Sequence, residues 1–91
     1  MVTVYGGPGV QSVRNAWQGM GWDQVLAHKG FVIWQLDNRG SSGRGHQFES
    51  VIYHDMGRHE LADQKEGIQY LVSQGFVDPK RICLLYTSRC V

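Results

Sequence analysis

The sequence lacks an excess of charge of either sign. Nine Lys and Arg residues stand against eight Asp and Glu residues, so the formal net charge of the 91 residues is +1. Domains that bind nucleic acids or anionic membranes through their electrostatic field carry a marked basic excess. No nucleic-acid partner is therefore expected.

Cysteine and long apolar runs are also scarce. Cys83 and Cys90 are the only two cysteines, and their positions predict neither a disulfide framework nor a CxxC zinc or redox pair. No apolar run approaches the roughly 20 residues that cross a bilayer, and the N-terminus has no signal-peptide pattern. Because the chain opens inside an expected strand, a targeting segment could lie upstream, and periplasmic, secreted and cytoplasmic locations all stay open.

The composition is that of a globular protein, with 42% hydrophobic and 19% charged residues. Ninety-one residues suit one domain at most, and so short a chain leaves much of its surface exposed unless something else covers it. No repeat or low-complexity segment divides the sequence further.

Strand and helix patterns alternate along the chain. Apolar and β-branched residues predict strands over 2–5, 31–36 and 81–85, and a 3.6-residue period predicts helices over 22–29 and 57–74. With right-handed crossovers this order gives an α/β fold, a parallel sheet of about three strands with two crossover helices. The edge strands of such a sheet would be unpaired, so we expect a piece of a larger domain, truncated at both ends.

The apolar residues of these segments predict which faces are buried. In the first helix they are Trp22, Val25 and Leu26, and in the second they are Leu61, Ile68, Leu71 and Val72. Val32, Ile33 and Trp34 form a continuous apolar run, which predicts a strand covered on both faces.

The first predicted strand runs into a loop that only glycine and proline could build, Gly6-Gly7-Pro8-Gly9, with Tyr5 at the junction. Loops at the carboxyl ends of strands are where α/β folds place their chemistry. Taken alone, these residues favour a strand that ends in an ordinary turn, with the Tyr5 ring packed at the edge of the sheet.

Other polar residues favour structural roles. The glycine spacing in the loop over 37–45 matches neither a dinucleotide nor a phosphate-binding motif, which favours a fixed turn held by hydrogen bonds of Asp37 and Arg39. His54 and His59 are five residues apart, off the spacing of two metal ligands on one helical face, and are expected to be exposed or in loops. No metal or cofactor is therefore expected. Glu60, Asp63 and Glu66 resemble a solvated helix face.

Six short segments occur in an order and spacing typical of one family. They are Val4-Tyr5-Gly6-Gly7-Pro8-Gly9, Asn15-Ala16-Trp17, Leu36-Asp37-Asn38-Arg39-Gly40-Ser41, Gly43-Arg44-Gly45, Asp63-Gln64 and Gly75-Phe76-Val77-Asp78-Pro79-Lys80-Arg81-Ile82. Together they resemble the start of the catalytic domain of the prolyl oligopeptidase family of serine peptidases, most closely its dipeptidyl peptidase IV branch. The resemblance implies a fragment of an α/β-hydrolase domain over residues 1–82, and it suggests that Asp63-Gln64 braces the neighbouring loop.

The resemblance also implies an activity and partners. Members of the family cleave short peptides, some after proline, with a Ser, Asp and His triad, and a β-propeller of the same chain caps the catalytic domain. A peptide substrate, that propeller and a homodimer of the intact protein are the implied partners. Tyr5 corresponds to the tyrosine whose hydroxyl donates to the oxyanion of the tetrahedral intermediate.

The last residues depart from the family pattern. Ser88 falls in the register of the nucleophile, but Tyr86 and Cys90 occupy positions where the nucleophile elbow needs small residues. Residues 83–91 are therefore expected to be the end of a strand followed by an anomalous tail, truncated or foreign, and the fragment is expected to be inactive alone. The alternative is a non-catalytic α/β module that binds a small ligand or a partner at the carboxyl ends of its strands.

Overall fold

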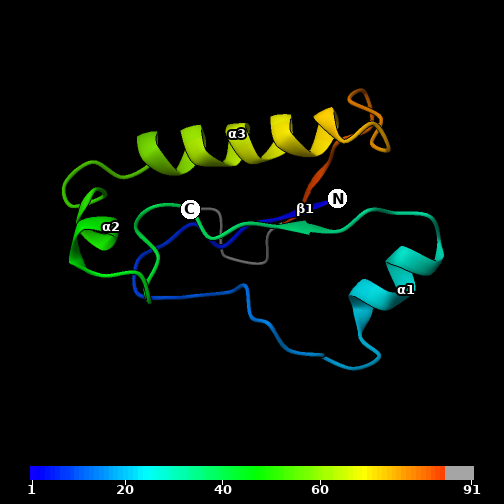
Figure 1. The fold of residues 1–91 in the computed structure, drawn as a ribbon, viewed down its shortest axis with the longest axis horizontal. Coiled ribbons are helices and arrows are strands. Elements are labelled where there is room, and N and C mark those ends of the chain that lie inside the picture. Colours follow the sequence, from blue (N-terminus) through cyan, green and yellow to red (C-terminus); the bar gives the residue numbers. More distant parts are fainter. Residues whose placement is uncertain (86–91) are drawn as a thin grey trace.

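The computed structural model describes residues 1–85. Its three short strands, β1 (Val2–Thr3), β2 (Trp34–Gln35) and β3 (Leu84–Leu85), form one sheet in the order β2-β1-β3. Both pairings are parallel. The predicted three-stranded parallel sheet is confirmed, and the strand that opens the chain lies at its centre (Figure 1).

The strands are shorter than the sequence pattern predicted. Single hydrogen bonds continue the ladder beyond them: the Trp34 N–H donates to the Met1 carbonyl at 2.9 Å, and the Val2 N–H donates to the Cys83 carbonyl at 2.8 Å. In the described part of the chain β2 and β3 each have one neighbouring strand, β1. Regular pairing is therefore limited to the few residues where β1 runs beside them.

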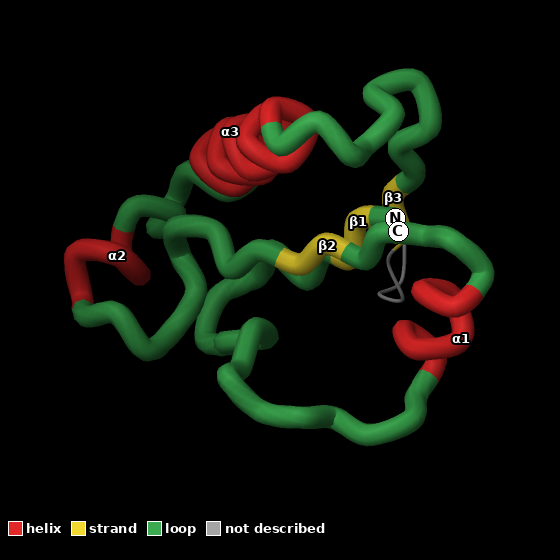
Figure 2. Tube along the Cα trace, turned by 45° about the vertical axis from the view of Figure 1, so that its right-hand side comes forward, coloured by secondary structure: helices red, strands yellow, loops and turns green. Residues whose placement is uncertain are grey.

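Within residues 1–85 three helices accompany the sheet, α1 (Trp22–His28), α2 (His46–Ser50) and α3 (Arg58–Ser73). Figures 1 and 2 show α3 along one face of the sheet and α1 on the other side, while α2 lies beyond the end of the strands. The two predicted crossover helices are confirmed, whereas the sequence pattern did not predict α2, which is too short to display a helical period. Among residues 1–85, none of the helices is both long enough and apolar enough to span a bilayer.

The ends of α3 follow from local chemistry. The Gly57 N–H, just before the helix, donates to the Glu60 carboxylate at 2.7 Å, which satisfies a backbone donor that the helix leaves free. Gly75 stops the helix at the other end, as its position predicted. The observed bounds differ from the predicted 57–74 by one residue at each end.

The buried face of α3 matches the predicted one in part. Leu71 is buried as predicted and Ile68 and Val72 are half-buried, whereas Leu61 is 57% exposed. The other buried residues of the helix are Gln64 and Gly67. A Cβ atom on Gly67 would lie 2.8 Å from Leu36 Cδ2, so the glycine lets the helix approach the residue that follows β2. A polar side chain and a glycine thus occupy positions that the apolar period did not reveal.

The apolar core is small, and much apolar surface is uncovered. Its buried hydrophobic residues are Val2, Leu26, Ile52 and Leu71. The predicted packing of Trp22 and Val25 is wrong, since they are 67% and 46% exposed, and the predicted cover on both faces of the second strand is wrong because Trp34 is only half-buried. Within residues 1–85 there is too little chain to bury these side chains, as the length predicted.

Candidate active site

Tyr5 lies just past the carboxyl end of the central strand β1. Its ring covers Gly7: a Cβ atom at that position would lie 3.0 Å from Tyr5 Cε1 and 3.3 Å from Tyr5 Oη. The side chain is about half exposed, and within residues 1–85 its hydroxyl has no hydrogen-bond partner. The ring therefore lies against the Gly7 backbone while its O–H stays available to a ligand.

The loop that follows Tyr5 is attached to the loop that follows β2. The carboxylate of Asp37 accepts hydrogen bonds from the Ser12 N–H at 3.0 Å and from the Val13 N–H at 2.8 Å. A hydrogen-bonded Asp37 is confirmed, but its partners lie in the first loop and not in its own turn. Asp37 therefore fixes the far end of the segment that begins at Tyr5.

Asn38 connects the near end of that segment to α3. Its side chain is 2% exposed, and its amide N–H donates to the Arg39 carbonyl at 2.7 Å and to the Gly6 carbonyl at 3.5 Å. The Gln64 amide donates in turn to the Leu36 carbonyl at 3.0 Å and to Asn38 Oδ1 at 3.3 Å. A chain of polar contacts thus runs from the buried face of α3 to the residue after Tyr5.

Asp63 of α3 binds both the backbone and the side chain of Arg39. It accepts from the Arg39 N–H at 2.8 Å and from the guanidinium at 2.8–3.0 Å. Partial burial acts to raise the pKa of Asp63, but the hydrogen bonds and charge of Arg39 outweigh it, and the pKa lies below its usual range. The Asp63-Gln64 brace is confirmed, and the solvated position predicted for Asp63 is wrong, since its side chain is 18% exposed.

The ion pair between Asp63 and Arg39 predicts that the folded chain loses stability in acid. Because the pKa of Asp63 is lowered in the folded chain, its stabilising effect is present above the unfolded pKa, about 3.9, and is lost as the pH falls through the folded value. We expect Asp63→Asn to lower the urea midpoint of the 91-residue chain at pH 7, and the difference from the unsubstituted chain to shrink below about pH 4. Asp23→Asn, on the exposed side of α1, is the control. If Asp63→Asn lowers the urea midpoint by the same amount at pH 7 and below about pH 4, the charge of Asp63 does not contribute to stability.

The histidines and Cys83 form no site of their own. His54 is exposed, but His59 is half-buried, with Nε2 3.5 Å from Asp55 Oδ2, which corrects its predicted place in a loop or at the surface. Cys83 is free and exposed. No group of three or more His, Cys, Asp and Glu residues within 1–85 is placed to hold a metal ion.

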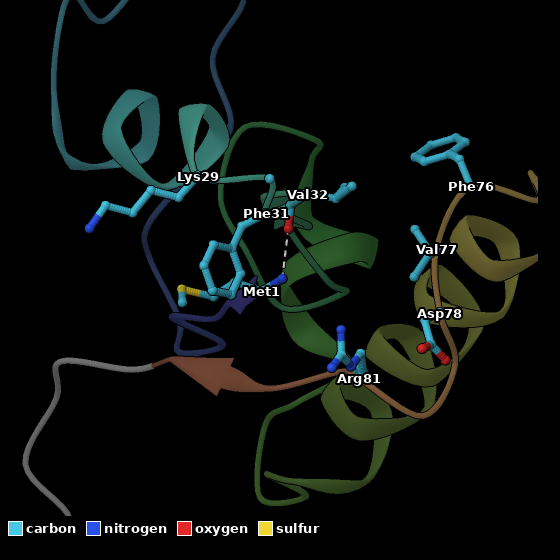
Figure 3. A pocket seen from close by; sticks show the side chains of 9 residues that line it. Met1, Lys29, Phe31, Val32, Phe76, Val77, Asp78 and Arg81 are labelled. Carbon is cyan, nitrogen blue, oxygen red and sulfur yellow. Dashed lines mark hydrogen bonds between the residues drawn. The ribbon is translucent and has the colours of Figure 1, made fainter.

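Two hollows lie at opposite ends of the sheet. One of about 370 Å³ lies at the amino ends of the strands, between Phe31 and Val32 before β2 and Asp78 and Arg81 before β3 (Figure 3). A second of about 600 Å³ lies beside the Tyr5 loop and is lined by Pro8 of that loop together with residues of α2 and the segment after it. Since α/β folds bind ligands at the carboxyl ends of their strands, the second hollow is on the side where chemistry is expected.

The structure places some predicted site residues and not others. Tyr5 is at the predicted strand end, whereas Ser88 lies outside the described residues, as do Tyr86 and Cys90. The sequence pattern did not identify Asn38 as a site residue. Its place in the motif over 36–41 was the available signal, but a motif does not say that a side chain points inward.

Comparisons with known proteins agree with this arrangement. The sequence pattern of the prolyl oligopeptidase family matches residues 18–88. The chain is 45% identical to mouse dipeptidyl peptidase 8 over 82 residues and 36% identical to human prolyl endopeptidase FAP over 85 residues. These alignments cover 87% and 92% of this chain but only 9% and 11% of those proteins, so the chain spans about a tenth of their length.

A solved structure shows the same piece of fold. The crystal structure of a putative dipeptidyl aminopeptidase IV from Bacteroides ovatus superposes with a TM-score of 0.85 at 41% sequence identity. The match covers 93% of this chain and 12% of that one, so the small α/β unit corresponds to a piece of its hydrolase domain. By sequence and by structure, the chain belongs to the prolyl oligopeptidase family.

Proposed function

We propose that this chain contributes to a serine peptidase of the dipeptidyl peptidase IV branch, in which Tyr5 donates a hydrogen bond to the oxyanion. The observation that carries the proposal is the position of Tyr5: it follows the central strand, its ring is held over Gly7, and its hydroxyl has no partner within residues 1–85. A fixed donor at the carboxyl end of a central strand suits a developing negative charge.

In the proposed mechanism the rest of the catalytic domain supplies the triad. A serine attacks the peptide carbonyl, a histidine takes its proton and returns it to the leaving amine, and an aspartate orients the histidine. The Tyr5 hydroxyl stabilises the tetrahedral oxyanion together with a backbone N–H beside the nucleophile. Residues 1–82 are the proposed extent of this part of the hydrolase domain.

Substrates and partners follow from the relatives. Their names, dipeptidyl peptidase and prolyl endopeptidase, support short peptides cleaved after proline as the substrate class. A β-propeller of the same chain and a homodimer are the proposed partners of the intact enzyme. The uncovered apolar residues Trp17, Met20 and Trp22, 67–91% exposed, are consistent with a chain that further protein covers.

A chimera tests the proposal. Residues 1–82 replace the aligned segment of mouse dipeptidyl peptidase 8, and hydrolysis of a Gly-Pro chromogenic substrate is measured. We expect turnover by the chimera and none by the 91-residue chain alone, because the chain has Tyr5 but no complete triad in residues 1–85.

The unfolding temperature of the chimera provides the folding control. If the chimera is unfolded, a smaller graft of residues 2–13, which keeps the helices of the host, replaces it. A chimera that folds like its host but does not turn over substrate would overturn the proposal and favour a non-catalytic module. Hydrolysis by the 91-residue chain itself would refute its expected inactivity.

A further inference from the structure

The loop that bears Tyr5 has few attachments of its own. Its backbone carbonyl at Gly6 is the nearest main-chain acceptor to Tyr5 that a side chain contacts, and that side chain is Asn38. A Cβ atom built on Gly6 would lie 3.9 Å from Asn38 Oδ1, so the Asn38 amide lies directly beside this residue. The position of Asn38 therefore affects the first residue after the proposed oxyanion donor.

The Asn38 side chain is itself held in place, by the Arg39 carbonyl and by Gln64 of α3. It is the most buried large side chain of the described residues, and both ends of its amide are engaged, the N–H group with two carbonyls and Oδ1 with Gln64. Gln64 is also buried, on the face of α3 that packs against the sheet, and it also binds the Leu36 carbonyl. Because the nitrogen and the oxygen of the Asn38 amide both have partners, its orientation is defined. Gln64 is held through its nitrogen alone, since its Oε1 is buried with no hydrogen-bond partner among the described residues.

We propose that Asn38 and Gln64 are positioning residues for the peptidase reaction: Gln64 orients Asn38, and Asn38 holds the Gly6 backbone so that the Tyr5 hydroxyl meets the oxyanion. This inference rests on the proposed function of Tyr5. Neither amide is expected to touch the substrate, because both side chains are buried. Their effect on the reaction passes through Tyr5.

A double-mutant cycle in the chimera tests the coupling. We expect Asn38→Ala to lower kcat about twofold to threefold with little change in KM, because its bond to the Gly6 carbonyl is long at 3.5 Å and belongs at the low end of the net strength of a hydrogen bond. In the Tyr5→Phe background the same substitution should have almost no effect, because the donor it positions is gone. A general loss of structure would lower kcat equally in both backgrounds.

Matched substitutions show whether the effect on kcat depends on the buried amides. Gln64→Met, which keeps the side-chain length and removes the amide, should reproduce part of the Asn38→Ala effect, whereas Gln69→Met on the exposed side of α3 and Asn15→Ala in an exposed loop should have none. If Asn38→Ala lowers kcat equally with and without the Tyr5 hydroxyl, the positioning role is overturned. If Tyr5→Phe leaves kcat unchanged, the oxyanion role of Tyr5 itself is overturned.

Amide hydrogen exchange of the 91-residue chain provides a readout that needs no activity. Asn38→Ala and Gln64→Met should both speed exchange in the segment over 4–9, because the Gly6 carbonyl loses its anchor, while Gln69→Met should leave it unchanged. Unchanged exchange in both variants would show that these amides do not hold the loop.

Discussion

Tyr5→Phe in the chimera is expected to lower kcat about 10²–10³-fold, the usual cost of removing one oxyanion donor. KM should change little, since the hydroxyl is proposed to bind the transition state more strongly than the substrate carbonyl. Phenylalanine keeps the ring that covers Gly7, and the hydroxyl has no partner to lose within residues 1–85. The unfolding temperature should therefore remain the same while turnover falls.

Tyr70→Phe is the matched control for this experiment. Tyr70 also presents an exposed phenol, 59% exposed, but it lies on α3 with its ring centroid 6.3 Å from that of Trp34, and it does not line the hollow beside Pro8. Removal of its hydroxyl should leave kcat unchanged. If Tyr5→Phe and Tyr70→Phe behave alike, Tyr5 is a packed tyrosine at the edge of the sheet and has no part in the oxyanion site.

The sequence predicted the order of strands and helices better than it predicted which residues of each element are buried. Strand and helix order follow from period and from glycine positions such as Gly30 and Gly75, which act locally. Burial depends on what packs against each element, and Leu61 is exposed while Gln64 is buried because the sheet contacts α3 along the line of Gly67. No local pattern contains that information.

The candidate site was predictable only in part for the same reason. Tyr5 is a candidate because it lies at a strand end before a glycine-rich loop, and its proposed role rests on the family resemblance. The contacts that hold it join residues 24 to 32 positions apart, such as Asp37 with Val13 and Asn38 with Gly6. Such pairs are set by the parallel crossover of the chain, which places two loops at the same edge of the sheet.

Gly40→Ala is expected to cause the largest loss of stability. Gly40 has a φ of +100°, which L residues rarely adopt, and a Cβ atom there would lie 2.6–2.8 Å from three side-chain atoms of Ile52. Ile52 is 5% exposed and belongs to the small core, so it has little room to move. Backbone strain of about 1–2 kcal/mol and overpacking of about 1–3 kcal/mol together predict a loss of about 2–5 kcal/mol, measured by tryptophan fluorescence of the 91-residue chain in urea.

Gly45→Ala separates the two contributions. Gly45 has a similar φ of +90°, but a Cβ atom there meets nothing within 4 Å. Gly45→Ala should therefore lose only the part of the stability that backbone strain costs. Adding Ile52→Ala to Gly40→Ala should relieve the overpacking and leave the cost of the cavity and the strained φ in its place, so that the double variant loses less than the sum of the two single losses. Equal losses for Gly40→Ala and Gly45→Ala would show that Ile52 does not press on this turn, and that hydrogen bonds to α3, to the Gly6 carbonyl and to the Phe48 carbonyl hold the loop over 38–40.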